Sequence, residues 1–212
     1  TLMIFLPVII TAQDDCKRSG LKNWPEGKSP EEIGIRVTKE FLNSDHSFWG
    51  RHPDPKLDEK VTMLTYPDVC TWLGGVWFAK ASNNEDLLER LEARYINLTE
   101  NEKHLLPPPV HVDNNVFGAL SFELYLNTRK PEYLKMGLKY ADTQWTLPAN
   151  ADADEKEWHE KGYSWQTRLW IDDMFMITAV QAQAFRATNN SKYVDRTAKE
   201  MVLYLDELQL EK

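Results

Sequence analysis

Apolar side chains recur along most of this chain at the three- and four-residue spacing of α-helices. The pattern predicts helices at residues 30–43, 67–82, 85–101, 116–128, 131–145, 173–188 and 191–208. The first has a well-formed start, because Ser29 can cap it and Pro30 suits the first helical position. Residues 45–60 are polar and contain proline, so we expect a loop there. Alternation typical of strands is absent, and the sequence predicts an all-α protein.

Short polar turns join three pairs of these helices, at residues 78–88, 124–134 and 184–194. Their recurrence predicts helical hairpins stacked in series. The first helix of a pair is the more apolar one, as residues 69–78 show beside the charged residues 87–95. Apolar helices are expected inside and amphipathic helices outside. Both a closed α/α toroid and an open solenoid satisfy this pattern.

The chain opens on an apolar run at residues 2–10, followed by Thr11-Ala12-Gln13. This pattern is typical of the hydrophobic region and cleavage zone of a secretory signal, and it is too short to span a bilayer. We therefore expect residues 1–13 to be a signal remnant, 14–28 a linker and 29–212 the helical domain. The signal predicts export, to a bacterial periplasm, with no membrane attachment after cleavage. A buried N-terminal strand is the alternative interpretation of the run.

The composition supports a globular domain, with 42% hydrophobic residues including 8 Trp, 8 Tyr and 8 Phe. A net charge of -8 without a basic stripe opposes binding to nucleic acid. The sequence has no glycine-rich phosphate loop, no metal-ligand spacing of Cys or His, and no nucleophile elbow, so no cofactor or metal is expected. Cys16 and Cys70 are expected as free thiols, with a disulfide as the alternative.

Candidate catalytic and binding residues lie where the apolar helices begin, in segments 64–69, 111–118 and 168–176. All three segments lie at the same end of their hairpins, so Tyr66, Asp113 and Asp172 are expected to meet at one mouth. Arg168 and Trp170 stand close to Asp172 in sequence. Guanidinium groups bind carboxylates bidentately and aromatic faces stack on sugar rings. These residue types suit a site for a uronic acid.

Each of these residues also has a structural interpretation. Asp172 could be a helix N-cap, Asp113 a turn or cap residue, and His111 a structural histidine. Asp173 adds an ambiguity, because adjacent helical residues point about 100° apart and only one of the two aspartates can face the interior. Four tryptophans fit either a glycan cleft or the core: Trp72, Trp77, Trp145 and Trp165.

Residues 32–208 resemble glycoside hydrolase family 105, the unsaturated rhamnogalacturonyl hydrolases, and more distantly family 88, the unsaturated glucuronyl hydrolases. The resemblance rests on residues 65–69, 111–113 with 116–118, 141–142 with 144–145, 168–176, 181–188 and 204–209. It implies an (α/α)6 barrel of six hairpins and no metal. In the family pattern Asp172 is the general acid and base, and Asp113 is its partner. Substrate-binding roles are expected for Tyr66, Trp170, Arg168 and His111.

The reaction that the resemblance implies removes a terminal 4,5-unsaturated uronic acid from lyase-generated pectin (rhamnogalacturonan) oligosaccharides. A protonated acid gives its proton to C4, water adds at C5, and the resulting hemiketal opens and releases the next sugar. Unsaturated glucuronyl hydrolysis and a noncatalytic helical-repeat glycan-binding module are the alternatives. Six hairpins need on the order of 300 residues. We therefore expect about the N-terminal half of the barrel, truncated at its C-terminus and self-associating through apolar surface that the rest would cover.

Overall fold

The computed structural model describes residues 23–46 and 61–209. In these ranges it contains eight α-helices and one 3-10 helix, and no strand. The elements are α1 (Pro30–Asn43), α2 (Tyr66–Ala81), α3 (Glu85–Glu100), η2 (Lys103–Leu105), α4 (Val112–Thr128), α5 (Pro131–Thr143), α6 (Ala153–Glu160), α7 (Asp173–Thr188) and α8 (Ser191–Leu208). The predicted all-α class is confirmed. The signal remnant, Cys16 and most of the 45–60 loop lie outside the described residues.

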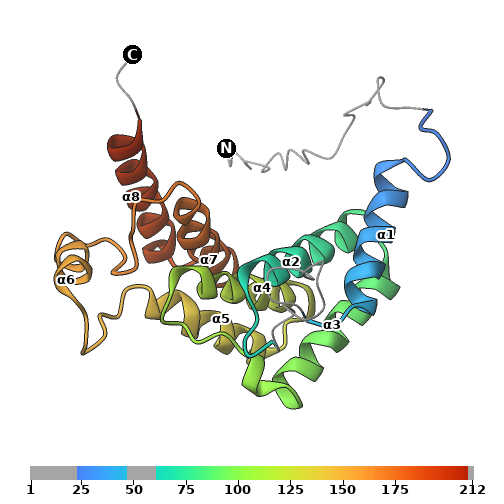
Figure 1. The fold of residues 1–212 in the computed structure, drawn as a ribbon, viewed down its shortest axis with the longest axis horizontal. Coiled ribbons are helices and arrows are strands. Elements are labelled where there is room, and N and C mark those ends of the chain that lie inside the picture. Colours follow the sequence, from blue (N-terminus) through green and yellow to red (C-terminus); the bar gives the residue numbers. More distant parts are fainter. Residues whose placement is uncertain (1–22, 47–60, 210–212) are drawn as a thin grey trace, which may run out of the picture.

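The helical hairpins follow one another around an arc, and their helices form an inner and an outer layer (Figure 1). The inner layer is α2, α4 and α7, with α4 packed against both of the others. Outside them, α3 packs on α2, α5 on α4 and α7, and α8 on α7, while α1 contacts α2 and α3. The apolar first helix of each predicted hairpin is therefore the inner one. Figure 1 shows α1 and α8 at opposite ends of the arc.

Glu123 shows that the inner helices run parallel. Its buried carboxylate accepts hydrogen bonds from Lys80 near the end of α2 and from Arg186 near the end of α7, at 2.7 and 2.9 Å. Burial alone would raise the pKa of Glu123, but hydrogen bonds from Lys80 and Trp77 and the charges of Lys80 and Arg186 lower it below its ordinary value. Since the helix ends meet here, the helix starts meet at the opposite end.

Helix boundaries agree with the sequence pattern where a cap marks them. Ser29 and Glu32 form the capping box that starts α1. Two differences arise from caps that hydrophobic spacing does not reveal. The fourth helix begins at Val112 rather than at residue 116, because His111 caps it through its ring. The sequence pattern missed α6, a polar helix that begins with a capping box of Asp152 and Glu155.

A row of aromatic rings passes through the core and joins both layers. Trp72 of α2 contacts Tyr95 of α3, and Tyr95 stacks on Phe117 of α4 with ring centroids 5.5 Å apart. Phe117 in turn contacts Tyr140 of α5. Gly118 permits this approach, since a Cβ atom there would lie 2.6 Å from the Cβ of Tyr140. The row fixes α4 between its neighbours and so fixes the helix start that carries Asp113.

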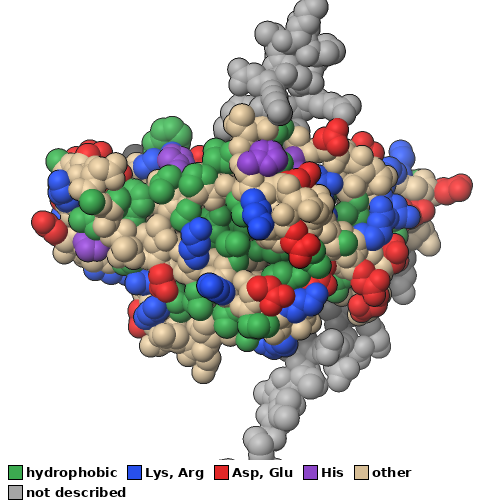
Figure 2. Space-filling view, turned by 90° about the horizontal axis from the view of Figure 1, so that it is seen from below, with side chains coloured by type: hydrophobic (Ala, Val, Ile, Leu, Met, Phe, Trp, Pro, Cys, Tyr) green, Lys and Arg blue, Asp and Glu red, His purple; other side chains and the backbone are tan. Residues whose placement is uncertain are grey.

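The described surface is mixed in charge. On the face shown in Figure 2, acidic and basic side chains are interspersed around hydrophobic ones. No described helix is both long enough and apolar enough to cross a membrane. Cys70 is a free thiol, and burial raises its pKa to about 11, so it remains protonated and unreactive at neutral pH.

Candidate active site

A connecting segment, residues 161–172, joins α6 to α7 across the end where the inner helices begin. Its middle part, residues 164–167, is buried although it is mostly polar, with Ser164 0% exposed and Thr167 5% exposed. Leu169 then adopts a left-handed backbone conformation, with φ of 57°. A residue with a Cβ pays about 1 kcal/mol or more for this region, so the surrounding contacts must hold it. The turn leaves Trp170 on the surface, 61% exposed.

Arg168 joins this segment to two helix starts. Its Nε and Nη2 donate to the two carboxylate oxygens of Asp173, at 3.0 and 2.5 Å. Nη2 also donates to Oδ1 of Asp113 in the first turn of α4, at 3.0 Å. The hydrogen bond to Asp173 raises the pKa of Arg168, and the charges of Asp173 and Asp113 add to the effect against partial burial. Its guanidinium also lies 4.6 Å from the ring centre of Trp170.

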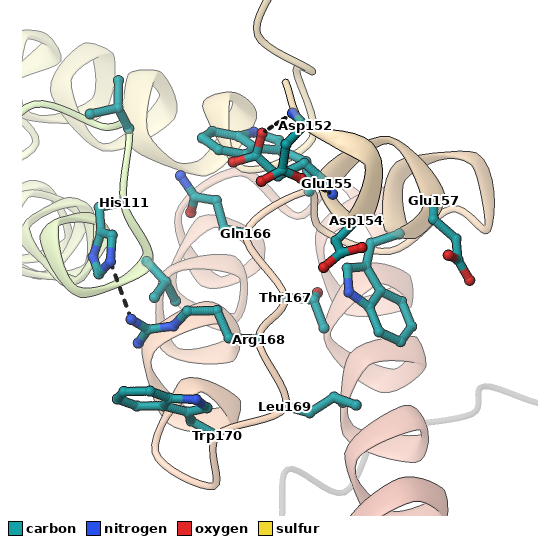
Figure 3. Close-up of a pocket in the computed structure, with 14 residues that line it drawn as sticks. His111, Asp152, Asp154, Glu155, Glu157, Gln166, Thr167, Arg168, Leu169 and Trp170 are labelled. Atoms are coloured by element: carbon teal, nitrogen blue, oxygen red, sulfur yellow. Dashed lines mark hydrogen bonds between the residues drawn. The ribbon is translucent and has the colours of Figure 1, made fainter. Parts of the chain in front are cut away.

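His111 lies on the side of Arg168 opposite Trp170 (Figure 3). Its Nδ1 accepts a hydrogen bond from the backbone of Asp113 and thereby caps α4, while its Nε2 lies 3.2 Å from Nη1 of Arg168. A neutral imidazole has one acceptor nitrogen and a protonated imidazole has none. The ring therefore cannot accept at both nitrogens at once. The ring thus touches the start of α4 through one nitrogen and Arg168 through the other, and only one of these nitrogens accepts at a time.

The two neighbouring aspartates at the start of α7 differ in position. Asp173 is fully buried and pairs with Arg168, whereas the side chain of Asp172 is exposed and forms no capping hydrogen bond. Asp173 is thus the one that faces the interior. Asp172 stands in the same turn as Trp170, whose carbonyl accepts from the backbone of Asp173. The described residues do not enclose Asp172, so they do not supply the burial that would favour a protonated acid.

A groove of about 610 Å³ opens beside Arg168 (Figure 3). One wall is formed by His111, Arg168 and Trp170. The opposite wall, here called the acidic wall, is formed at α6 by Asp152, Asp154, Glu155 and Glu157. Trp165 also lines the groove, although it is mostly buried and donates to the carbonyl of Thr143. The groove combines aromatic side chains with carboxylates, as sugar-binding sites do.

Two of the acidic-wall carboxylates are engaged in the capping box of α6, and Glu157 pairs with Lys161 at 2.5 Å. Asp154 is exposed and has no partner among the described residues. These residues contain no cluster of three or more His, Cys, Asp or Glu side chains able to hold a metal ion. The groove therefore presents mainly negative charge opposite Arg168.

The remaining predicted residues lie nearby or in the core. Tyr66 is the first residue of α2, at the same end of the inner layer, and packs half-buried against the core. Trp72 is a core residue, while Trp77 is 43% exposed on the same helix. Trp145 packs on the core, and the guanidinium of Arg196 lies 4.7 Å from the centre of its ring.

A comparison with protein-family models matches residues 38–212 to glycosyl hydrolase family 88. The chain belongs to this family. As a member of glycosyl hydrolase family 88 it is a glycoside hydrolase that acts on unsaturated uronyl residues, and its helices are part of the six-hairpin α/α toroid. No curated protein and no solved structure matches the chain.

In this member of family 88 the structure brings together four of the predicted site residues: Asp113, His111, Arg168 and Trp170. Sequence reasoning did not assign the pairing of Asp173 with Arg168, or the acidic wall of α6. The spacing of Asp152 and Glu155 is the sequence signal that could have located α6. No comparable signal identifies Asp173, because two adjacent aspartates look alike in the sequence.

Proposed function

We propose that this family 88 chain removes a 4,5-unsaturated uronic acid from lyase-generated rhamnogalacturonan oligosaccharides, the activity of family 105. The observation that carries the proposal is the junction of Asp113 with Arg168, 3.0 Å apart, beside the turn that presents Trp170 and Asp172. The junction places a carboxylate, a cation, an aromatic ring and a second carboxylate at one end of the inner helices.

In the proposed reaction Asp172 is the general acid and base. Its carboxyl proton passes to C4 of the unsaturated ring, positive charge develops at C5 and the ring oxygen, and water adds at C5 as Asp172 takes a proton back. Arg168 holds Asp113 in place as the partner carboxylate, where its charge stabilises the developing cation. A sugar stacked on the open face of Trp170 would exclude water from Asp172.

Arg168 has a different role in this proposal from the substrate-binding role that the sequence predicts. The fork of donors that a uronate carboxylate would need is occupied by Asp173 and Asp113. Arg168 therefore positions these carboxylates. Tyr66 and His111 remain proposed substrate contacts at the same end of the inner layer.

The acidic wall favours a neutral sugar next to the unsaturated uronic acid. Four acidic residues line the groove, and Asp154 among them has no partner in the described residues, whereas Arg168 is already paired. A sulfated or carboxylated sugar in the groove would be repelled, whereas rhamnose would not be. This supports rhamnogalacturonan products over the glucuronate-ended products of sulfated glycans.

Export to a bacterial periplasm and self-association remain predictions. The exposed side of α8 carries apolar side chains at spacings of seven, four and three residues, and they offer a surface for contact with other helices: Val194, Met201, Leu205 and Leu208.

The decisive experiment follows loss of the ultraviolet absorbance of the conjugated double bond when full-length protein meets lyase-digested rhamnogalacturonan. Wild type should consume the double bond, and Asp172→Asn should abolish turnover while its circular dichroism and thermal midpoint stay unchanged. Asp154→Asn is the matched control, because it neutralises an exposed aspartate that lines the groove beside Arg168.

Three other outcomes redirect the assignment. Turnover restricted to glucuronate-ended products supports the unsaturated glucuronyl alternative. Glycan binding without turnover by wild type and by Asp172→Asn supports a binding module. Full turnover by Asp172→Asn removes Asp172 from the mechanism.

A further inference from the structure

Glu200 is a buried carboxylate outside the groove. It lies on the outer helix α8, its side chain is 0% exposed, and the proposed chemistry does not use it. A carboxylate in such a place requires hydrogen-bond donors around it. Its hydrogen-bond donors indicate its role, because they all belong to the connecting segment of residues 161–172.

Both donors belong to the connecting segment. The backbone amide of Ser164 donates to Oε1 of Glu200 at 2.5 Å. The hydroxyl of Thr167 lies 3.3 and 3.4 Å from the two carboxylate oxygens, and 2.8 Å from the carbonyl of Ser164. Since the hydroxyl has a single proton, it serves either the carboxylate or the carbonyl at one time. In both arrangements Glu200 closes the turn that precedes Arg168.

Tyr204 extends this contact by one helical turn. It is 1% exposed, and its hydroxyl forms no hydrogen bond with the described residues. Burial raises the pKa of this phenol, and the nearby backbone groups of Arg168 and Leu169 partly oppose the rise. Two successive inward positions of α8 therefore face the connecting segment.

The segment has further anchors besides Glu200. Ser164 donates its hydroxyl to the carbonyl of Gln144 at 2.9 Å, and the side chain of Gln166 contacts Asn115 of α4. These bonds fix the segment to the end of α5 and to α4. Two residues of α8 hold it on the other side: Lys199 donates to the carbonyl of Lys161 at 2.6 Å, and Glu200 accepts from the buried turn that leads to Arg168. The left-handed Leu169 follows directly, so a loosened turn would let its strain relax and would displace Arg168.

From these contacts we infer that Glu200 is a positioning residue of the active site. Acting from α8, it holds the connecting segment so that Arg168 keeps Asp113 and Asp173 in place. The inference rests on the proposed function for its effect on turnover. Its effect on the segment is independent of which substrate the protein uses.

The first arm of the test measures amide hydrogen exchange of the full-length protein in peptides that cover residues 161–172. Glu200→Ala should raise exchange there at least tenfold over wild type. Glu200→Gln should not, because its carbonyl oxygen still accepts from Ser164 and its amide can donate to Thr167. Glu123→Ala is the matched control, since Glu123 is an equally buried carboxylate at the far end of the inner helices.

The second arm compares kcat and KM on the unsaturated rhamnogalacturonan disaccharide. Glu200→Ala should lower kcat at least tenfold with KM changed less than threefold, and Glu200→Gln should restore kcat to within threefold of wild type. In an Arg168→Ala background, Glu200→Ala should lower kcat little further, because both changes disturb the same placement of Arg168 against Asp113 and Asp173. Glu123→Ala should lower the thermal midpoint and leave kcat near wild type.

Unchanged exchange at residues 161–172 in Glu200→Ala overturns the inference whatever the activity. So does an equal loss of kcat in Glu123→Ala, which would show a general effect of stability. If Glu200→Ala does not fold, exchange in Glu200→Gln decides, and a tenfold rise there contradicts the proposed geometry. Wild type without turnover refutes the proposed function, while the exchange arm still decides whether Glu200 holds the segment.

Discussion

Arg168 donates to Asp113 across 55 positions of sequence, with Nη2 and Oδ1 3.0 Å apart. The bond ties the connecting segment to the first turn of α4, and the bidentate contact with Asp173 ties it to α7. A single guanidinium thus links two neighbouring inner helices at the end where the proposed chemistry takes place.

Removing this guanidinium should destabilise the protein. Arg168→Ala leaves Asp173 buried without its cation, and we expect a loss of about 3 kcal/mol in the free energy of unfolding. Urea denaturation measures it. The matched control is Arg196→Ala on α8, whose partner Asp142 is 45% exposed, so the cost there should be below about 1 kcal/mol. Equal costs for the two variants would contradict the assigned role of Arg168.

Glu200 should make stability depend on pH. Burial raises its pKa from 4.5 to about 7, against hydrogen bonds from Ser164 and Thr167 and the charge of Lys199 on the same helix. The folded state therefore binds this proton more tightly than the unfolded state. The stabilisation is complete below the unfolded pKa and is lost as pH rises through about 7, by about 3 kcal/mol in total.

The measurement is the difference in unfolding free energy between Glu200→Gln and wild type, taken from pH 4 to pH 8 by about half-unit steps. The difference should move in favour of Glu200→Gln as pH rises, because the glutamine does not ionise. A difference that is constant over this range would show that folding does not change the pKa of Glu200. Asp173 and Tyr204 face the same region, and both are unchanged in the comparison.

Two glycines should respond in opposite directions to alanine. Gly118→Ala places a Cβ 2.6 Å from the Cβ of Tyr140 and should cost about 1–3 kcal/mol of stability. Gly74 lies in the exposed interior of α2 with no atom within 4 Å of its Cβ position, so Gly74→Ala should stabilise by about 0.5–1 kcal/mol. Thermal unfolding of both variants checks the close contact between α4 and α5.

Charge on the acidic wall should control which sugar follows the uronic acid. Asp154→Lys should raise kcat/KM for a sulfated unsaturated disaccharide by about two- to fivefold at low salt, and the gain should vanish at high salt. Glu89→Lys on α3 makes the same charge change away from the groove and should have no such effect. An equal response in both variants would show net charge, rather than the wall, to be responsible.

Much of the fold was predictable, because hydrophobic spacing reports which face of each helix is buried. The bounds of α1, α7 and α8 agree with prediction, and each has a clear cap or a charged start. The missed helix, α6, has no buried residue, so its sequence lacks the apolar pattern on which the prediction depends.

The site was harder to predict, because its roles depend on contacts between distant residues. The sequence placed Asp113 and Arg168 at one end of the fold but could not show that they touch. It also could not distinguish Asp172 from Asp173, since a helical turn of about 100° decides which of them is buried. Glu200 gave no signal at all, because its burial depends on how α8 packs against a segment without regular structure.

Glu123 has a consequence for how the protein unfolds. In a stack of hairpins each unit contacts only its neighbours, and such arrays can open from one end while the rest stays folded. Here one carboxylate on the middle inner helix bonds to Lys80 on one flanking helix and to Arg186 on the other. Opening either flank leaves that buried charge short of a partner. The three hairpins should therefore melt in one cooperative transition, and the terminal pair should not fray ahead of the others.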